Sequence, residues 1–157
     1  MLEMSHWQKF VRQGQRILGL FTRPMTLGVR VIALDANGHV FLVRHTYVPG
    51  FHLPGGGVES GETAIKSLER ELDEEGGLEM TETPSLVGFY YNPRHSGRDH
   101  VVLYLARNVR RTRVRAPDWE IAESGFYPLD ALPEKATAST RARIAEYLRQ
   151  SPSNSVW

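Results

Sequence analysis

The sequence predicts a single-domain α/β protein, folded as a mixed sandwich of strands and helices. Three observations lead to this prediction: apolar, β-branched runs come early in the chain, one helical pattern follows them, and further strands precede a closing helical pattern. The chain has 157 residues, of which 41% are hydrophobic and 24% are charged. A chain of that size and composition can bury a core of its own without disulfides or metal staples.

The first two strands are expected over the apolar runs at Leu27 to Leu34 and Val40 to Val43. Between them stands Asn37-Gly38, a dipeptide that strongly favours a tight hairpin turn. Residues 47–57 are expected to form a loop, because proline and glycine recur through that segment. We therefore predict a hairpin followed by a long loop.

A helix is predicted over Thr63 to Glu75. Leu68 and Leu72 recur at helical spacing, which gives this helix one apolar edge for packing on the core. The pair Gly76-Gly77 follows directly, and glycine is the residue that most readily ends a helix.

The later elements follow the same two periodicities. Three further strands are expected, at Leu86 to Tyr91, Val101 to Ala106 and Phe126 to Leu129. A closing helix is expected over Ser139 to Gln150, with Ile144, Tyr147 and Leu148 on one face. The domain would then cover residues 27–150, preceded by an amphipathic lead-in over residues 1–26 that packs on it. Residues 151–157 are expected to be a frayed tail.

Composition excludes several classes of function. The sequence has no cysteine, which rules out disulfides, thiolate catalysis and cysteine-based zinc or iron–sulfur sites. A net charge of +1 gives no reason to expect nucleic acid or a membrane surface as a partner. No apolar run approaches the ~20 residues that span a bilayer, and residues 1–10 lack the apolar stretch of a signal peptide. We therefore expect a cytoplasmic protein.

An acidic cluster near the end of the predicted helix is the strongest functional signal. Glu71, Asp73, Glu74 and Glu75 lie within five positions, and such charges repel one another by tenths of a kcal/mol per pair. At about 100° per residue, the three glutamates fall within an arc of roughly 100° on one edge of the helix. Partly buried carboxylates would raise each other's pKa, and a hard divalent cation would relieve the repulsion. Because Mg²⁺ fills its remaining positions with water and phosphate, a phosphate-bearing ligand is expected.

The cluster belongs to a longer pattern, G-x5-E-x7-R-E-L-x-E-E-x-G-L, which runs from Gly56 to Leu78 with Glu62 and Arg70 at its fixed offsets. At every fixed position this pattern is similar to the signature of the Nudix hydrolase family. Leu53-Pro54-Gly55-Gly56 resembles the usual approach to that signature. Phe126-Tyr127-Pro128-Leu129 resembles the usual late segment of the family, where tryptophan is more common than Phe126.

The resemblance implies cleavage of the pyrophosphate bond in a nucleoside diphosphate linked to another group. It implies an α/β/α sandwich around a mixed sheet, and a loop–helix–loop that binds Mg²⁺ or Mn²⁺. By matching position, Glu71 and Glu75 would be the principal metal ligands and Glu74 an additional one. The backbone carbonyl of Gly56 would complete part of the metal's coordination shell.

The resemblance also implies supporting roles. Arg70 would orient the carboxylates, with Glu62 as its ion-pair partner, and Gly77 would be a structural member of the motif. A general base must take a proton from the attacking water. In the family this base is either a glutamate of the motif, here Glu71 or Glu74, or an acidic residue of a later loop.

For the later loop the first candidate base is Glu120 and the second is Glu123. The alternative, in which both are ordinary surface carboxylates, is left open. Activity measurements on Glu120→Gln and Glu123→Gln would decide between the two interpretations.

Residues outside the motif are expected to set the substrate preference. The candidates are Tyr47, Phe51, Tyr91 and Arg94. Pro93 stands sixteen residues after Gly77, which resembles the spacing of the ADP-ribose-cleaving subgroup. The alternative, in which the aromatic residues only pack their loops, is left open. No paired ligand spacing is found among four of the histidines, and no role is assigned to them: His6, His39, His45 and His100.

The leading hypothesis is a Mg²⁺-dependent hydrolase of a nucleotide pyrophosphate bond, with ADP-ribose or a nucleotide sugar as the first substrate. Alternatives within the same class are a housecleaning nucleoside triphosphate pyrophosphohydrolase and an RNA 5′-pyrophosphohydrolase. The alternative from another class is a non-catalytic module that binds a nucleotide. The expected partner is a small-molecule nucleotide, with no membrane and no nucleic acid, and a homodimer is left open.

Overall fold

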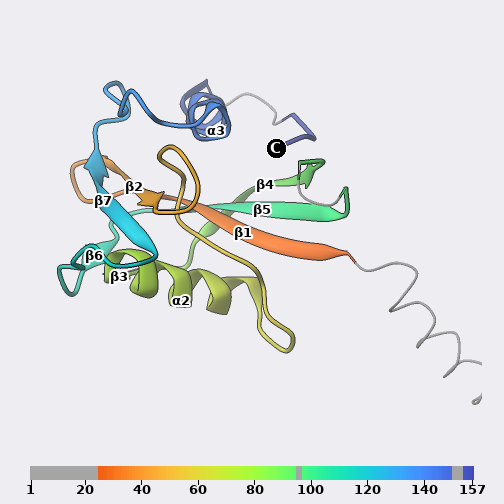
Figure 1. The fold of residues 1–157 in the computed structure, drawn as a ribbon, viewed down its shortest axis with the longest axis horizontal. Helices are drawn as coiled ribbons and strands as arrows, with labels where there is room; N and C mark the ends of the chain where they lie inside the picture. Colours follow the sequence, from red (N-terminus) through yellow and green to blue (C-terminus); the bar gives the residue numbers. More distant parts are fainter. Residues whose placement is uncertain (1–24, 95–96, 150–153) are drawn as a thin grey trace, which may run out of the picture.

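The computed structural model describes residues 25–94, 97–149 and 154–157. Two helices lie on opposite sides of the strands: α2 (Ala64–Gly76) covers one face and α3 (Ala138–Arg149) covers the other (Figure 1). The predicted α/β sandwich is therefore confirmed. The predicted lead-in over residues 1–26 falls almost wholly outside the described residues and stays a prediction.

The described residues form seven strands. They are β1 (Thr26–Ala33), β2 (Val40–His45), β3 (Leu78–Glu79), β4 (Ser85–Asn92), β5 (Asp99–Ala106), β6 (Arg110–Arg111) and β7 (Ile121–Tyr127). The main sheet has the order β1-β5-β4, with β1 parallel and β4 antiparallel to β5. β2 pairs with β7, and the two-residue strands β3 and β6, which the sequence did not predict, pair with each other.

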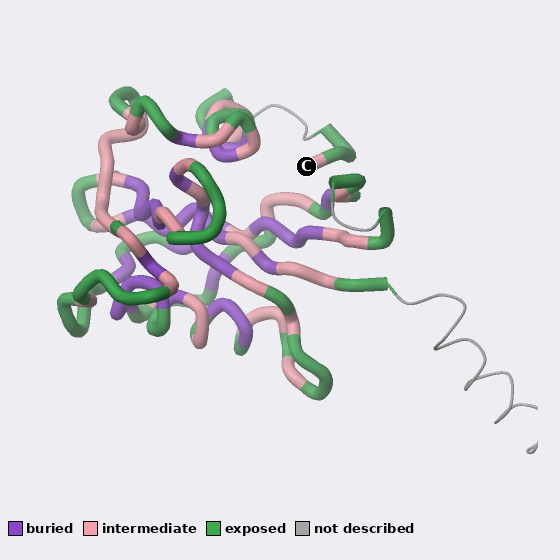
Figure 2. The backbone as a smooth tube through the Cα atoms, viewed as in Figure 1, coloured by how far each residue is buried: buried purple, intermediate pink, exposed green. Residues whose placement is uncertain are grey.

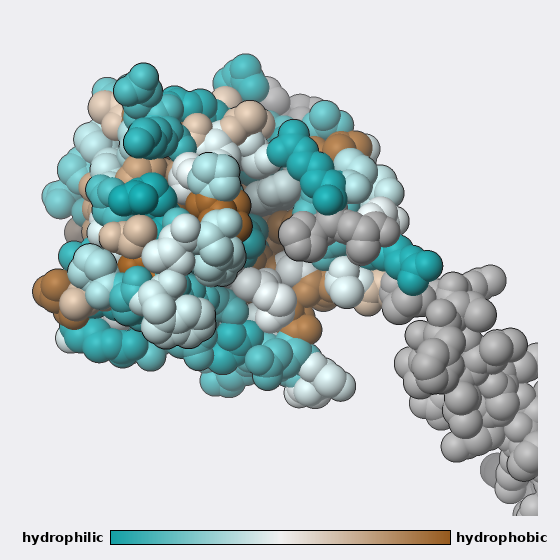
Figure 3. All heavy atoms as spheres, viewed as in Figure 1, coloured by the Kyte–Doolittle hydropathy of each residue, from teal (hydrophilic) through white to brown (hydrophobic). Residues whose placement is uncertain are grey.

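The core forms two clusters. One gathers around Val29, Phe41 and Leu72 on the side of α2, and the other around Leu42 and Ile144 on the side of α3. The buried backbone is concentrated in the central strands, as Figure 2 shows. The outer face seen in Figure 3 is mostly hydrophilic, with hydrophobic side chains in small patches. Within the described residues, no helix is both long and apolar enough to cross a membrane.

The predicted hairpin is wrong beyond its turn. The turn itself forms, with Gly38 at φ +78° and its N–H donating to the carbonyl of Asp35 at 3.1 Å. Only Leu34 and Val40 then pair across it, and the two strands diverge. Asn-Gly specifies the turn, but the partner of each strand is decided by what else competes for its edges.

The competing segment is the loop before α2. On the edge of β1 opposite β5, Val29 donates to the carbonyl of Gly56 at 2.9 Å, and Val31 donates to that of Pro54 at 3.1 Å. The same loop pairs with β2, where the Val43 and His52 backbones exchange hydrogen bonds. The loop therefore lies between β1 and β2 and prevents them from pairing directly.

The helix predicted over Thr63 to Glu75 is confirmed as α2, shifted by one residue. Thr63 is the N-cap, and its side chain accepts a hydrogen bond from the N–H of Lys66. Gly77 ends the helix in the left-handed conformation at φ +59°, which glycine adopts without strain. Leu68 and Leu72 are fully buried, as their spacing predicted.

Two later elements differ from the prediction. β7 begins at Ile121, well before the predicted Phe126, because antiparallel pairing with β2 extends along the whole segment. The closing helix is present as α3, but Leu148 is exposed. The buried side chains of α3 are Thr140, Arg143 and Ile144, which recur at three- and one-residue steps on its inner face.

The described end of the chain is not a frayed tail. Tyr91 donates to the carbonyl of Ser155 at 2.8 Å, and Trp157 donates back to the carbonyl of Tyr91 at 3.0 Å. The Trp157 ring meets Tyr90 edge-on at 5.4 Å between centroids, with the Arg143 guanidinium 5.5 Å from it. β4 is an edge strand, so its outer N–H and carbonyl groups need partners, and residues 155–157 provide them.

Replacement of Trp157 by alanine is therefore expected to destabilise the fold. Loss of the contacts with Tyr90 and Arg143 should cost about 1 kcal/mol, or a melting temperature lower by about 4 °C. Thermal unfolding followed by circular dichroism would measure the change. Val156→Ala is the matched control, since its side chain is exposed. Equal melting temperatures for wild type and Trp157→Ala would show that the tail adds no stability.

Candidate active site

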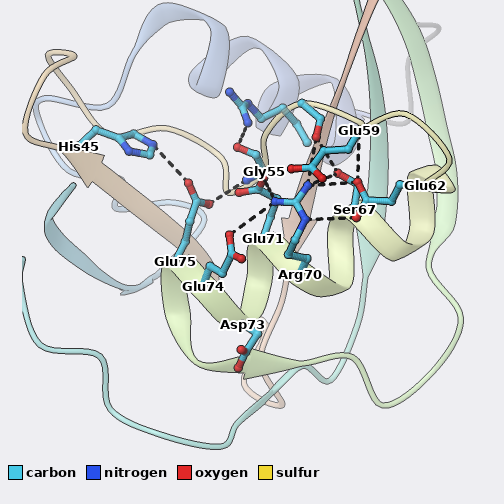
Figure 4. A network of polar contacts seen from close by, with 12 residues as sticks. His45, Gly55, Glu59, Glu62, Ser67, Arg70, Glu71, Asp73, Glu74 and Glu75 are labelled. Carbon is cyan, nitrogen blue, oxygen red and sulfur yellow. Dashed lines mark hydrogen bonds and ion pairs between the residues drawn. The ribbon is translucent and has the colours of Figure 1, made fainter.

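Arg70 is the centre of a polar network on α2 (Figure 4). Its Nε and Nη2 each bind one carboxylate oxygen of Glu62 at 3.1 Å, so the expected ion pair is present and bidentate. Its Nη1 lies 2.6 Å from Glu71 Oε1 and 3.5 Å from Glu74 Oε2. The hydrogen bond from Arg70 holds the pKa of Glu62 below its ordinary value. Arg70 thus fixes the loop before α2 relative to the helix and orients Glu71.

The three glutamates of the motif differ sharply in burial. The side chains of Glu75 and Glu71 are 6% and 14% exposed, whereas that of Glu74 is 58% exposed. Glu71 and Glu75 lie one helical turn apart and face the loop before α2, as Figure 4 shows. Asp73 points away from them and forms an ion pair with Arg113. The single acidic edge predicted from the sequence therefore consists of one buried carboxyl group, one partly buried carboxyl group and one exposed carboxylate.

Glu75 is held by backbone and by a neighbouring strand. Its Oε2 accepts the N–H of Gly55 at 2.9 Å, and its Oε1 lies 3.4 Å from Nε2 of His45. Burial raises the pKa of Glu75 to about 8, against the opposing effect of Arg30. Burial also lowers the pKa of His45 to about 4. Without a cation, burial therefore favours the neutral form of both groups over an ion pair.

Gly56 forms a cradle for Glu71. A Cβ atom at Gly56 would lie 2.5 Å from the carboxyl carbon of Glu71, so no larger residue fits without moving that carboxyl group. Burial raises the pKa of Glu71, and Arg70 opposes the rise. The Gly56 carbonyl, predicted as a metal ligand, already accepts the N–H of Val29. A carbonyl oxygen has two lone pairs, so one remains for a further partner.

Arg30 belongs to the site and was missed by sequence reasoning. Its side chain comes from β1 and donates to the carbonyl of Gly55, while its charge lowers the pKa of both Glu71 and Glu75. The signal was present in the sequence, because Arg30 interrupts an apolar strand between the fully buried Val29 and Val31. His45, which had no assigned role, also joins the site because β2 ends beside Glu75.

The two candidate bases from the later part of the chain, Glu120 and Glu123, lie in different surroundings. Glu120 precedes β7, and its carbonyl accepts the N–H of Thr46 at 2.9 Å, next to the site. After burial, the charge of Glu120 is the main cause that raises the pKa of Tyr47, and the same charge also raises that of Glu75. Glu123 is in β7 rather than in a loop and forms an ion pair with Arg44 at 3.0 Å.

The four predicted substrate residues do not gather in one place. Tyr47 is 65% exposed and lines a cavity of about 480 Å³ that His45 also lines. Phe51 is 5% exposed and packs against Tyr127, so its predicted contact with substrate is wrong: its ring fills the core on the side of α3. Tyr91 and Arg94 bond to Gly97 and Ser139, respectively. No contact of these last two with the motif is present among the described residues.

The donors near Glu71 and Glu75 fit a hard divalent cation chemically. They are carboxylate and carbonyl oxygens, the ligands that Mg²⁺ prefers. In the described part of the chain no three of the His, Asp and Glu side chains converge as a preformed metal site. Arg70 bonds to Glu71, and the buried Glu75 favours its protonated form. Cation binding would therefore displace a proton and rearrange carboxylates.

The model of the NUDIX domain family matches residues 24–148. The chain belongs to the Nudix family. It is accordingly a Nudix hydrolase that acts on small nucleotide substrates, and the reading of the motif between Gly56 and Leu78 as the family signature is confirmed.

Individual relatives of this Nudix hydrolase carry different names. The ADP-ribose pyrophosphatase of Methanocaldococcus jannaschii is 36% identical over 120 residues, which are 74% of this chain and 69% of the relative. A putative 8-oxo-dGTP diphosphatase of Bacillus subtilis is 34% identical over 76 residues, 48% of this chain and 50% of the relative. The crystal structure of a MutT Nudix hydrolase from Burkholderia pseudomallei superposes with a TM-score of 0.63 at 26% identity. That match covers 76% of this chain and 95% of the other.

The buried Glu75 makes the metal-free Nudix hydrolase sensitive to pH. Its pKa is raised from 4.5 to about 8 on folding, so the folded state binds the proton more tightly than the unfolded state. The stability from this group is complete below about pH 4.5, and it is lost as the pH rises toward about 8.

We therefore expect Glu75→Gln to be more stable than wild type at about pH 8.5 with a chelator present, by roughly 5 °C in melting temperature. The glutamine oxygen can still accept the Gly55 N–H, but no charge is buried. The difference should shrink as the pH falls to about 4.5. Thermal melts across this range would measure it, with Glu74→Gln as the exposed control. A difference independent of pH would contradict the expectation.

Proposed function

We propose that this protein hydrolyses the pyrophosphate bond of a nucleoside diphosphate linked to another group, using Mg²⁺ or Mn²⁺, with ADP-ribose or a nucleotide sugar as its substrate. The observation that carries the proposal is the pair Glu71 and Glu75, which lie against the backbone of Gly56 and Gly55, respectively. The similarity to an ADP-ribose pyrophosphatase supports this choice of substrate. The expected cytoplasmic location and a homodimer stay predictions.

The cation would be held by Glu71 and Glu75, with Glu74 as an outer ligand and the Gly56 carbonyl offering its second lone pair. When bound, such an ion neutralises charge on the phosphate oxygens and lowers the pKa of a water molecule. The roles of the chain itself follow from its contacts. Arg70 keeps Glu71 facing the loop, and the Gly55 N–H holds one oxygen of Glu75 so that the other can turn to a ligand.

We assign the proton-accepting role to Glu120 because it lies at the edge of the site, where its charge acts on Tyr47 and Glu75. Glu123 is held by Arg44 on β7 and is the weaker candidate. Glu71 and Glu74, the alternatives within the motif, both lie against the Arg70 guanidinium. The Arg70 guanidinium therefore occupies carboxylate oxygens that a proton acceptor in the motif would need to free.

Glu120→Gln is expected to lower kcat by about 10²- to 10⁴-fold with little change in KM, because a glutamine cannot accept the proton. Steady-state kinetics would measure both parameters. Glu123→Gln is the matched control and should keep wild-type kcat. Near wild-type turnover in Glu120→Gln would remove it from the mechanism and return the role to a glutamate of the motif.

The substrate is tested by product release from a panel of ADP-ribose, nucleotide sugars, nucleoside triphosphates and RNA with a 5′-triphosphate. We expect mononucleotide release from ADP-ribose only with Mg²⁺ or Mn²⁺. Glu71→Gln should lower kcat/KM at least 10²-fold, since it removes a ligand charge. Glu69→Gln is the control on the same helix, where Glu69 forms an ion pair with Lys66. Binding of ADP-ribose with no product from any substrate would instead support a non-catalytic module.

A further inference from the structure

We infer that Tyr47 and Trp119 form a stacking site for the nucleobase of the substrate, beside the carboxyl groups of α2. This inference rests on the proposed function, which requires a nucleotide substrate but leaves its base without a binding site. Sequence reasoning assigned no role to Trp119. The two aromatic residues belong to segments far apart in the chain, one just after β2 and the other just before β7.

Thr46 joins these two segments. Its hydroxyl donates to the carbonyl of Trp119 at 2.6 Å, and its N–H donates to the carbonyl of Glu120 at 2.9 Å. Tyr47 is the next residue after Thr46. Both aromatic residues are therefore attached to one junction, which two hydrogen bonds from Thr46 hold together. β2 and β7 pair from Val40 to His45, with a shift of register between Arg44 and His45, and the junction lies at the end of this pairing. The two rings therefore come from segments that backbone and side-chain hydrogen bonds hold together.

The exposure of both rings calls for an explanation. Trp119 is 82% exposed and Tyr47 is 65% exposed, whereas the largest aromatic side chains of the core are fully buried. In the described part of the chain, the Trp119 ring has no aromatic or cationic partner. The exposed Phe89, by contrast, is already stacked on His100. Free aromatic faces bind bases by stacking, worth about 1–3 kcal/mol for each base.

The position of Tyr47 links the rings to the chemistry. Its ring centroid lies 5.3 Å from that of His45, and His45 Nε2 lies 3.4 Å from Glu75. Tyr47 and His45 line the cavity of about 480 Å³, a size within the range of small-molecule sites. Trp119 lies outside that lining, and Thr46, which belongs to it, connects the cavity to Trp119. A nucleotide whose phosphates reach Glu71 and Glu75 would therefore have its base at the edge of this cavity, on the side of Thr46.

A nucleobase fits this surface better than a second protein chain does. The junction is surrounded by charged groups, with Glu120 next to Trp119 and the Arg44–Glu123 ion pair on the paired strands β2 and β7. Charged residues are depleted at the centres of protein–protein interfaces. Aromatic faces with charged and hydrogen-bonding neighbours suit a flat ring that carries polar edges.

The test compares ligands that differ only in the base. We expect wild type to bind AMP at least tenfold more tightly than ribose 5-phosphate in calorimetric titration. Tyr47→Leu and Trp119→Leu should each lose most of that preference, while binding ribose 5-phosphate as wild type does. Tyr47→Phe keeps the ring and should keep the preference. Phe89→Leu is the matched control, an exposed aromatic residue that is already stacked elsewhere.

Kinetics provide a second measurement on the same variants. With ADP-ribose, each leucine variant should raise KM about tenfold and leave kcat within twofold of wild type. Equal AMP preference in wild type and both leucine variants would overturn the inference. So would a dimer in wild type that becomes a monomer in the variants with no change in base preference. Failure of wild type to hydrolyse any nucleotide would overturn the proposed function alone, because the AMP titration does not depend on catalysis.

Discussion

The hydrogen bonds between the loop before α2 and its two neighbouring strands are the constraint on which the site depends. The loop bonds to β2 at His52 and to β1 at Gly56. This double attachment places Gly55 between the Arg30 guanidinium, which donates to its carbonyl, and Glu75, which accepts its N–H. One residue thus connects a cation on β1 to an acid on α2, and movement of the loop would break both contacts.

The packing that stabilises the domain also places ionisable carboxyl groups where their charged forms are unfavourable. Leu68 and Leu72 bury one edge of α2 in the core, and on the neighbouring edge the side chains of Glu71 and Glu75 are only 14% and 6% exposed. Burial raises the pKa of each carboxyl group. The folded chain therefore binds a proton, or another positive charge, more tightly at this place than the unfolded chain does. A divalent cation would satisfy both groups at once, which is the physical basis of the proposed metal dependence.

Prediction succeeded where the determinants are local. The bounds of α2 follow from Thr63 and Gly77, whose capping roles depend on residues within one turn. The Arg70–Glu62 ion pair also follows from the motif. Prediction failed where distant segments compete: the Asn37-Gly38 turn forms without a hairpin, and Phe51 turns into the core. The local sequence of neither segment identifies the distant residues that it packs against.

The sequence by itself determined the family, the reaction class, the acidic helix and its capped ends. Each of these depends on particular residue types at short, fixed separations along the chain. The tertiary structure alone decided which carboxyl groups are buried, and that Arg30 and His45 stand beside them. It also brought Tyr47 and Trp119 to one junction. The physical reason is that burial and strand pairing depend on residues far apart in the chain, whose free energies are settled only when the whole core assembles.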